Sequence, residues 1–237
     1  YAFASNTYLQ TVSLPSGLLS IGFAAFKDCA NLDTVSFRGG PSLLVIEYEA
    51  FYNCANLRIF DIPSTLTRIE EKAFAETDRL IALNLEGCEE LTYIGDYAFE
   101  NSGIAFARLP ASLIEMGEGA FKGAYNLASV NLADTALGYI AKEAFAGANS
   151  LTGAVLPASV RTIGEAAFMD CVSLVQVSLN QTLSSIGDKA FYNTAIATIA
   201  LPRSLESMGD LAFGNNASLK NITVPFVGKS PSDSDPA

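Results

Sequence analysis

The sequence predicts an α/β repeat fold, a right-handed solenoid of parallel strands joined by short helical turns, and three observations lead to this prediction. An Ala-Phe pair recurs every 22 to 25 residues along the chain. Ile or Met stands five residues before each of these phenylalanines, with Leu or Val three residues earlier again. A segment of the form L-x-x-V-x-L follows each pair, and such fixed-period self-similarity is typical of solenoids. The nine phenylalanines are Phe26, Phe51, Phe74, Phe99, Phe121, Phe145, Phe168, Phe191 and Phe213.

Each L-x-x-V-x-L segment is predicted to form a short strand with one face buried. Its fourth and sixth positions are apolar and are separated by a polar or small residue, as in Leu127-Val130-Leu132 and Leu174-Val177-Leu179. This two-residue period is typical of a half-buried strand. Strands of successive units are expected to stack in parallel, about 4.8 Å apart.

The Ala-Phe blocks are expected to return the chain to the next strand. A block such as GDKAFYN (187–193) is too short to bury a face alone, so it is interpreted as a single turn of α- or 3₁₀-helix. Pro follows the strand in every second unit and ends it, because Pro has no N–H for the ladder. In the other units, Gly, Asn or Asp must allow the same change of chain direction after the strand, as in LEGCEEL and LADTAL.

The chain is predicted to hold one repeat domain of nine to ten units over residues 1–227. Residues 228–237, which begin GKSPSDSD, form a polar tail or linker without an apolar period. The first residue is Tyr1 rather than Met, so we expect a processed or truncated product from which any targeting peptide is missing.

Composition excludes several classes of function for this 237-residue chain. Its 50% hydrophobic content is incompatible with intrinsic disorder, and its net charge of −11 argues against nucleic acid and anionic membrane partners. No uninterrupted apolar stretch approaches a membrane span of about 18 residues. The absence of His removes Ser-His-Asp, Cys-His and HExxH mechanisms. We therefore expect no catalytic residues, no metal and no cofactor; Ser-Lys or carboxylate mechanisms remain open, but no motif supports them.

The pattern LPxSLxxIGxxAFxxxxxLxxVxL resembles the BspA-type leucine-rich repeat, also called the Treponema pallidum type. Residues 156–179, LPASVRTIGEAAFMDCVSLVQVSL, match it almost position by position, and the resemblance extends from Leu9 to Pro225. It implies a curved leucine-rich-repeat solenoid with a concave parallel sheet. Members of this family are mostly secreted or surface proteins of bacteria and some protists, and resemble adhesins and ligand-binding modules rather than enzymes.

A line of acidic residues is expected along one edge of the solenoid, two positions after the repeating Ile or Met of six units. One interpretation is a ladder that binds Ca²⁺, which takes oxygen ligands. The other, which we favour, places each carboxylate in the first turn of its own short helix, near orphan N–H groups. Lys142 interrupts the line and relieves its repulsion. The acidic residues are Glu71, Asp96, Glu118, Glu165, Asp188 and Asp210.

The four cysteines are expected to be buried free thiols. Cys29, Cys54 and Cys171 all lie three residues after an Ala-Phe phenylalanine, where other units have small residues. Cys29 and Cys54 belong to adjacent units, so a disulfide between them is the alternative. Cys88 has no evident mate, and no CxxC spacing indicates zinc. Three N-x-S/T sequons, at Asn180, Asn216 and Asn221, matter only in a secreted eukaryotic chain.

The candidate ligand-binding residues lie on the exposed face of the strands, at the third and fifth positions of L-x-x-V-x-L. Most residues there are small and neutral, and the exceptions cluster in mid-solenoid. An exposed aromatic beside an Arg is typical of interface centres. The alternatives are that these are ordinary solvated strand residues, or that Phe106 is turned inward in its shortened unit. The candidates are Ile59, Asp61, Asn84, Phe106, Arg108 and Asn131.

The sequence therefore predicts a non-enzymatic binding module of a secreted or cell-surface protein, which presents its concave sheet to a protein or glycan ligand for adhesion or recognition. A structural array is the alternative, in which units stack end to end in an extracellular fibre or coat. It rests on the lack of a clear polar cap at either end, since solenoids need caps for solubility.

Overall fold

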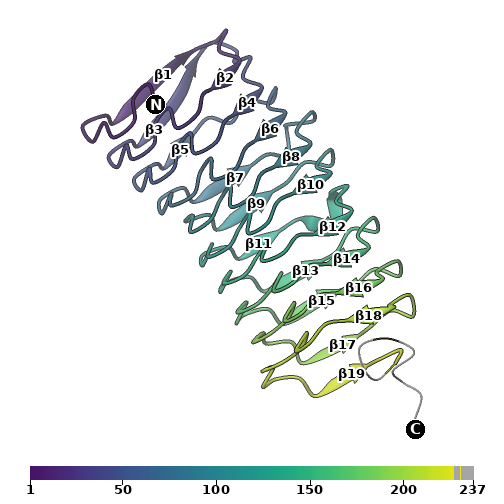
Figure 1. Ribbon diagram of the computed structural model, residues 1–237. Coiled ribbons are helices and arrows are strands. Elements are labelled where there is room, and N and C mark those ends of the chain that lie inside the picture. Colours follow the sequence, from purple (N-terminus) through teal and green to yellow (C-terminus); the bar gives the residue numbers. More distant parts are fainter. Residues whose placement is uncertain (227–229, 231–237) are drawn as a thin grey trace.

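The computed structural model describes residues 1–226 and Ser230, and it confirms a solenoid of parallel strands (Figure 1). The L-x-x-V-x-L segments form one wall of the coil. Because these strands carry odd numbers, we call this wall the odd-strand face. Its strands are β1 (Thr11–Pro15), β3 (Thr34–Arg38), β5 (Ile59–Phe60), β7 (Ala82–Asn84), β9 (Phe106–Arg108), β11 (Ser129–Val130), β13 (Gly153–Val155), β15 (Gln176–Ser178), β17 (Thr198–Ala200) and β19 (Asn221–Thr223).

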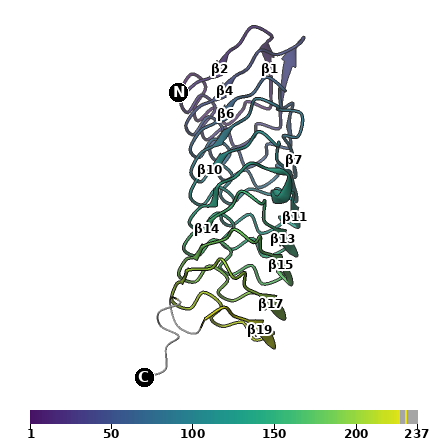
Figure 2. The ribbon, with the colours of Figure 1, turned by 90° about the vertical axis from the view of Figure 1, so that its right-hand side faces the viewer.

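A second wall of two-residue strands, which the sequence analysis did not predict, lies opposite the first. Figure 2 shows these even-numbered strands on one side of the coil and the odd-numbered strands on the other. Each ends on the Ile or Met five residues before the ring, and two residues are too few to show an alternating pattern. The strands are β2 (Ser20–Ile21), β4 (Val45–Ile46), β6 (Arg68–Ile69), β8 (Tyr93–Ile94), β10 (Glu115–Met116), β12 (Tyr139–Ile140), β14 (Thr162–Ile163), β16 (Ser185–Ile186) and β18 (Ser207–Met208).

The strands pair in parallel, and equivalent positions of successive coils face one another. Val12 lies opposite Val35, and Leu83 lies opposite Ala107. The odd-strand face is divided into the sheets β1-β3-β5, β11-β9-β7, β13-β15 and β17-β19. The even-numbered strands form the sheets β10-β8-β6-β4-β2 and β12-β14-β16-β18. Like residues therefore stack on like residues, as the repeat predicts.

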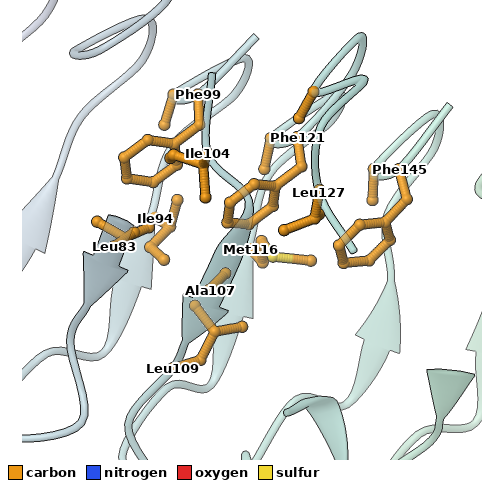
Figure 3. Packing of buried hydrophobic residues seen from close by; sticks show 14 of the residues in the cluster. Leu83, Ile94, Phe99, Ile104, Ala107, Leu109, Met116, Phe121, Leu127 and Phe145 are labelled. Atoms are coloured by element: carbon orange, nitrogen blue, oxygen red, sulfur yellow. The ribbon is translucent and has the colours of Figure 1, made fainter. Parts of the chain in front are cut away.

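A column of stacked phenylalanine rings occupies the core beside the return turns. Figure 3 shows three of these rings, Phe99, Phe121 and Phe145, with the aliphatic ladders beneath them. Successive ring centroids lie 5.1 to 5.6 Å apart, and the ring planes differ by no more than 14°. The column contains the nine predicted rings and a tenth, Phe3, which stacks on Phe26. The pair Ala2-Phe3 stands 23 residues before Phe26, so the sequence carried this signal too.

The predicted helical return turns are wrong. In the described residues the one helical element is a 3₁₀ turn, η1 (Leu132–Asp134), and it lies in a corner after β11. The Ala-Phe blocks instead carry residues with φ of +48° to +73°, two positions before and two after each ring of Phe26 to Phe213. An α-helix requires negative φ throughout, so the block cannot be helical. These residues are Ala24, Asp28, Glu49, Asn53, Lys72, Glu76, Tyr97, Asn101, Gly119, Gly123, Glu143, Gly147, Ala166, Asp170, Lys189, Asn193, Leu211 and Asn215.

The alternating backbone turns every second N–H toward the next coil. Around Phe145, the N–H groups of Glu143, Phe145 and Gly147 donate to carbonyls of the following coil at 2.9, 2.8 and 2.8 Å. The intervening N–H groups close turns within the block, as from Ala146 to the carbonyl of Glu143 at 3.0 Å. A helix would direct all of these bonds within one coil. The return side is thus a third hydrogen-bonded ladder.

The predicted tail and the search for membrane-spanning helices both depend on which residues the structure describes. The polar tail predicted for residues 228–237 lies outside them, apart from Ser230. Within them, no helix is long and apolar enough to cross a membrane.

Removing one ring from the column is expected to destabilise the fold strongly. Phe145→Ala deletes a side chain with no exposed surface and leaves a cavity, so the free energy of unfolding should fall by about 3 to 5 kcal/mol. Urea denaturation measures this change. Phe106→Ala, which truncates a ring that is 56% exposed, is the matched control and should change stability by less than about 0.5 kcal/mol. Equal stability of the two variants would contradict the buried column.

Two glycines separate the effect of positive φ from the effect of close packing. Alanine at Gly147 would have φ near +73° but meets other atoms only at 3.7 Å, so it should cost about 1 kcal/mol. At Gly119 the added Cβ would also lie 2.4 Å from the Tyr97 ring, adding about 1 to 3 kcal/mol. Denaturation midpoints of Gly147→Ala and Gly119→Ala test this order; a larger loss at Gly147 would refute it.

Candidate ligand-binding surface

The odd-strand face presents its third and fifth segment positions to solvent, as predicted. Phe106 is 56% exposed, whereas its neighbour Ala107 is buried. Phe106 lies in register with Ala82 on one side and Ser129 on the other. The shortened unit therefore does not turn Phe106 inward, and its ring stands above two small neighbours.

The structure separates the six candidate residues into two groups. Ile59 and Asp61 belong to the β5 segment, which is not paired with β7. Three of the remaining candidates lie on the β7-β9-β11 sheet, where Asn84 faces Arg108 in register, and Asn131 directly follows β11. Phe106, Arg108 and Asn131 border one hollow, and the other three candidates do not line it.

This hollow has a volume of about 490 Å³ and lies over β9 and β11. Besides the three candidates, it is lined by Ser129, Glu86 and Asp134. Neither acid was predicted from the sequence as a site residue, because both lie in the turns after the strands rather than on the strands. Glu86 and Asp134 belong to the segments LEGCEEL and LADTAL, in units that lack the Pro that follows the strand in every second unit. The missing Pro is the sequence feature that could have indicated these two acids.

An exposed ion pair crosses the edge of the hollow. The Arg108 guanidinium lies 3.3 Å from a carboxylate oxygen of Glu86, and the two side chains are 67% and 63% exposed. Such a solvated pair contributes little to stability, so both groups remain available to hydrogen-bond a bound molecule. Asn84 orients the acid, since its Oδ1 accepts the backbone N–H of Glu86 at 3.2 Å.

Asn131 has a structural role that its position on the exposed face did not reveal. Its Oδ1 accepts the N–H of Leu109 at 2.7 Å, and its Nδ2 donates to the Leu109 carbonyl at 3.1 Å. The same Nδ2 donates to Asp134 at 3.2 Å. The amide thus replaces the backbone partner that Leu109 loses where the chain leaves β11 for η1.

The acidic line does not follow the favoured helical interpretation, because its blocks are not helices. Two of the carboxylates accept backbone N–H groups of the next coil instead: Asp96 from Glu118 at 2.8 Å, and Asp188 from Asp210 at 2.7 Å. Lys142 lies 3.6 Å from Glu118, as expected for a residue that relieves repulsion. Among the described residues, no group of three or more acids or cysteines is placed to hold a metal ion.

All four cysteines are buried free thiols, so the alternative disulfide between Cys29 and Cys54 is not formed. The Sγ atoms of Cys29, Cys54 and Cys171 each lie 3.1 Å from the carbonyl oxygen of the column phenylalanine one coil earlier. Burial raises the pKa of Cys171 to about 12 and that of Cys88 to about 11. These thiols are therefore protonated packing groups at neutral pH.

Two of the three sequons use their amide nitrogens inside the solenoid. Asn180 Nδ2 donates to the carbonyls of Pro157 and Val160 at 2.6 and 2.9 Å. Asn216 Nδ2 donates to the backbone carbonyls of Phe191 and Phe213 at 2.9 and 3.0 Å. Asn221 is exposed on β19, so it is the sequon whose side chain faces solvent.

The chain belongs to the BspA-type leucine-rich repeat family. A family model described as "BspA type Leucine rich repeat region" matches residues 1–128 and 138–230 in six copies. This match confirms the family that the repeat pattern resembles. Among curated proteins, none matches this chain in sequence.

Solved structures of bacterial leucine-rich repeat proteins from Bacteroides ovatus and Eubacterium ventriosum share the fold. One from Bacteroides ovatus is 26% identical, with a TM-score of 0.83 over 92% of this chain and 58% of that one. One from Eubacterium ventriosum is 22% identical, with a TM-score of 0.58 over 90% of this chain and 59% of that one. A leucine rich cell surface protein from Faecalibacterium prausnitzii is 19% identical, with a TM-score of 0.45 over 95% and 81%. The chain thus spans under two thirds of the length of the first two.

Substitution of Asn131 should affect stability rather than only binding. Asn131→Ala leaves the N–H and carbonyl of Leu109 without their partners, so we expect a loss of about 1 to 3 kcal/mol in the free energy of unfolding. Asn84→Ala is the control, because Asn84 is exposed and caps only a surface turn. Chemical denaturation of both variants gives the comparison, and wild-type stability in Asn131→Ala would rule out the structural role.

Proposed function

We propose that this chain is a non-enzymatic binding module of a secreted or cell-surface protein, and that its odd-strand face contacts a protein or glycan ligand in adhesion or recognition. One observation carries the proposal: Phe106 is more than half exposed beside a hollow edged by the Arg108–Glu86 pair. Aromatic residues and Arg are enriched at the centres of interfaces. The surrounding strand positions are small and mostly neutral, so this cluster is the distinctive feature of the face.

The chemistry of the chain supports binding rather than catalysis. The sequence has no His to act as a general base. Its four thiols are buried, and burial raises the pKa of each. Placement outside the cell rests on the family resemblance, since members are mostly secreted or surface proteins.

The proposal is tested by screening the purified chain for binding to an oligosaccharide array and to a random peptide library. The double variant Phe106→Ala with Arg108→Ala should weaken every specific hit by about tenfold or more, because truncating an interface centre typically has this effect. Its matched control is Tyr139→Ala with Arg161→Ala, which removes an aromatic residue from β12 and the Arg that directly precedes β14 on the opposite wall.

The two variants must first show wild-type unfolding, so that any lost binding is local. Hits that survive the Phe106 and Arg108 changes but disappear in the control variant would place the binding surface on the even-numbered strands. That result would overturn the assignment of the odd-strand face.

A further inference from the structure

A second hollow adjoins the first on the odd-strand face. It has a volume of about 340 Å³ and is lined by Ser129, Asn131, Gly153, Val155, Gln176 and Ser178, among others. Both hollows include Ser129, Val130 and Asn131, so they form one continuous depression, which we call the trough. The trough crosses β9, β11, β13 and β15, which follow one another along the solenoid axis (Figure 1). Three intervals of about 4.8 Å give it a length of about 14 Å.

Gly153 keeps the trough open without being needed by the fold. Its φ is not in the left-handed region, and an added Cβ would meet only a carbonyl oxygen of Gln176, at 3.7 Å. Neither backbone conformation nor packing therefore requires glycine here. In the third-position column, Ser129 and Gly153 lie between Phe106 and Gln176, so two small residues separate a ring from an amide.

The trough combines polar and apolar side chains, and its three charged groups, Arg108, Glu86 and Asp134, leave one net negative charge. Arg108 pairs with Glu86, and the remaining charge is that of Asp134, whose carboxylate oxygen accepts a hydrogen bond from the Asn131 amide. The other exposed polar side chains of the trough are uncharged: Ser129, Thr152, Gln176 and Ser178. Beside them, Phe106 and Val155 are more than half exposed and offer apolar surface.

We propose that the trough binds a neutral oligosaccharide that lies along the solenoid axis, and this inference rests on the proposed function. A pyranose ring presents C–H groups on its faces and hydroxyls around its rim. The Phe106 ring can pack against such a face, while Arg108, Glu86 and Gln176 supply donors and acceptors to hydroxyls. A peptide typically anchors a large side chain in a deep, desolvated pocket, whereas the residues that line this trough are mostly small and lie along an extended strand face.

The experiment uses the wild-type chain with short linear glucans, mannans, galactans and xylans, and with a random peptide library. Gly153→Phe fills the trough, and Thr198→Phe is its matched control, because Thr198 occupies the same column on β17 outside the trough. Gly153→Phe and Phe106→Ala should each weaken binding of a neutral glycan by about tenfold or more, whereas Thr198→Phe should not. Because the glycan is uncharged, its affinity should not fall as the salt concentration rises.

Three outcomes decide between the ideas. Glycan binding that depends on both Phe106 and Gly153 supports the inference. If the chain binds peptides through Phe106 but binds no neutral glycan, the proposed function stands and the glycan assignment is overturned. The glycan assignment is also overturned if a glycan binds Gly153→Phe as tightly as it binds the wild-type chain. If no ligand found in the screen binds more weakly to Phe106→Ala than to the wild-type chain, both the glycan assignment and the proposed function of this face are overturned.

Discussion

The stacking of each phenylalanine ring on the ring of the next coil is the contact on which the rest of the structure depends. A coil of about 23 residues cannot bury a core alone, so its apolar residues are shielded only by the coils on either side. Centroid separations of 5.1 to 5.6 Å are close to the spacing of paired strands, so one ring per coil keeps all the ladders in step. Ring packing and backbone pairing therefore fix the same repeat.

The return turns show how strongly this inter-coil contact acts on the backbone. The block Glu165-Ala166-Ala167-Phe168 is composed mainly of good helix formers. Ala166 nevertheless has a φ of +52°, and its N–H donates to Asp188 of the next coil at 2.8 Å. Left-handed backbone costs about 1 to 2 kcal/mol at a residue with a Cβ. The ladder of bonds to the neighbouring coil offsets that cost, and it places the ring in the column.

Sequence reasoning was accurate where the repeat itself carries the information. The ring column, the strand register and the exposed position of Phe106 all follow from residues at fixed offsets. It failed where the deciding partner lies in another coil: single-coil propensity favours helix in the Ala-Phe blocks, and the structure has a ladder there. The role of Asn131 and the position of Glu86 and Asp134 depend on the path of the corner after β11, which no periodic pattern describes.

Because the buried columns hold the coils together, the outward positions of the odd-numbered strands are free to differ from coil to coil, and the candidate surface uses that freedom. Amide hydrogen exchange tests the inter-coil ladder most directly. The account predicts that the N–H groups of Phe51, Phe99 and Phe145 exchange as slowly as those in the centres of β7 and β9, because each donates to the next coil. An isolated helical turn would leave its first N–H groups without partners. Fast exchange at these phenylalanines, with protection confined to the strands, would contradict the account.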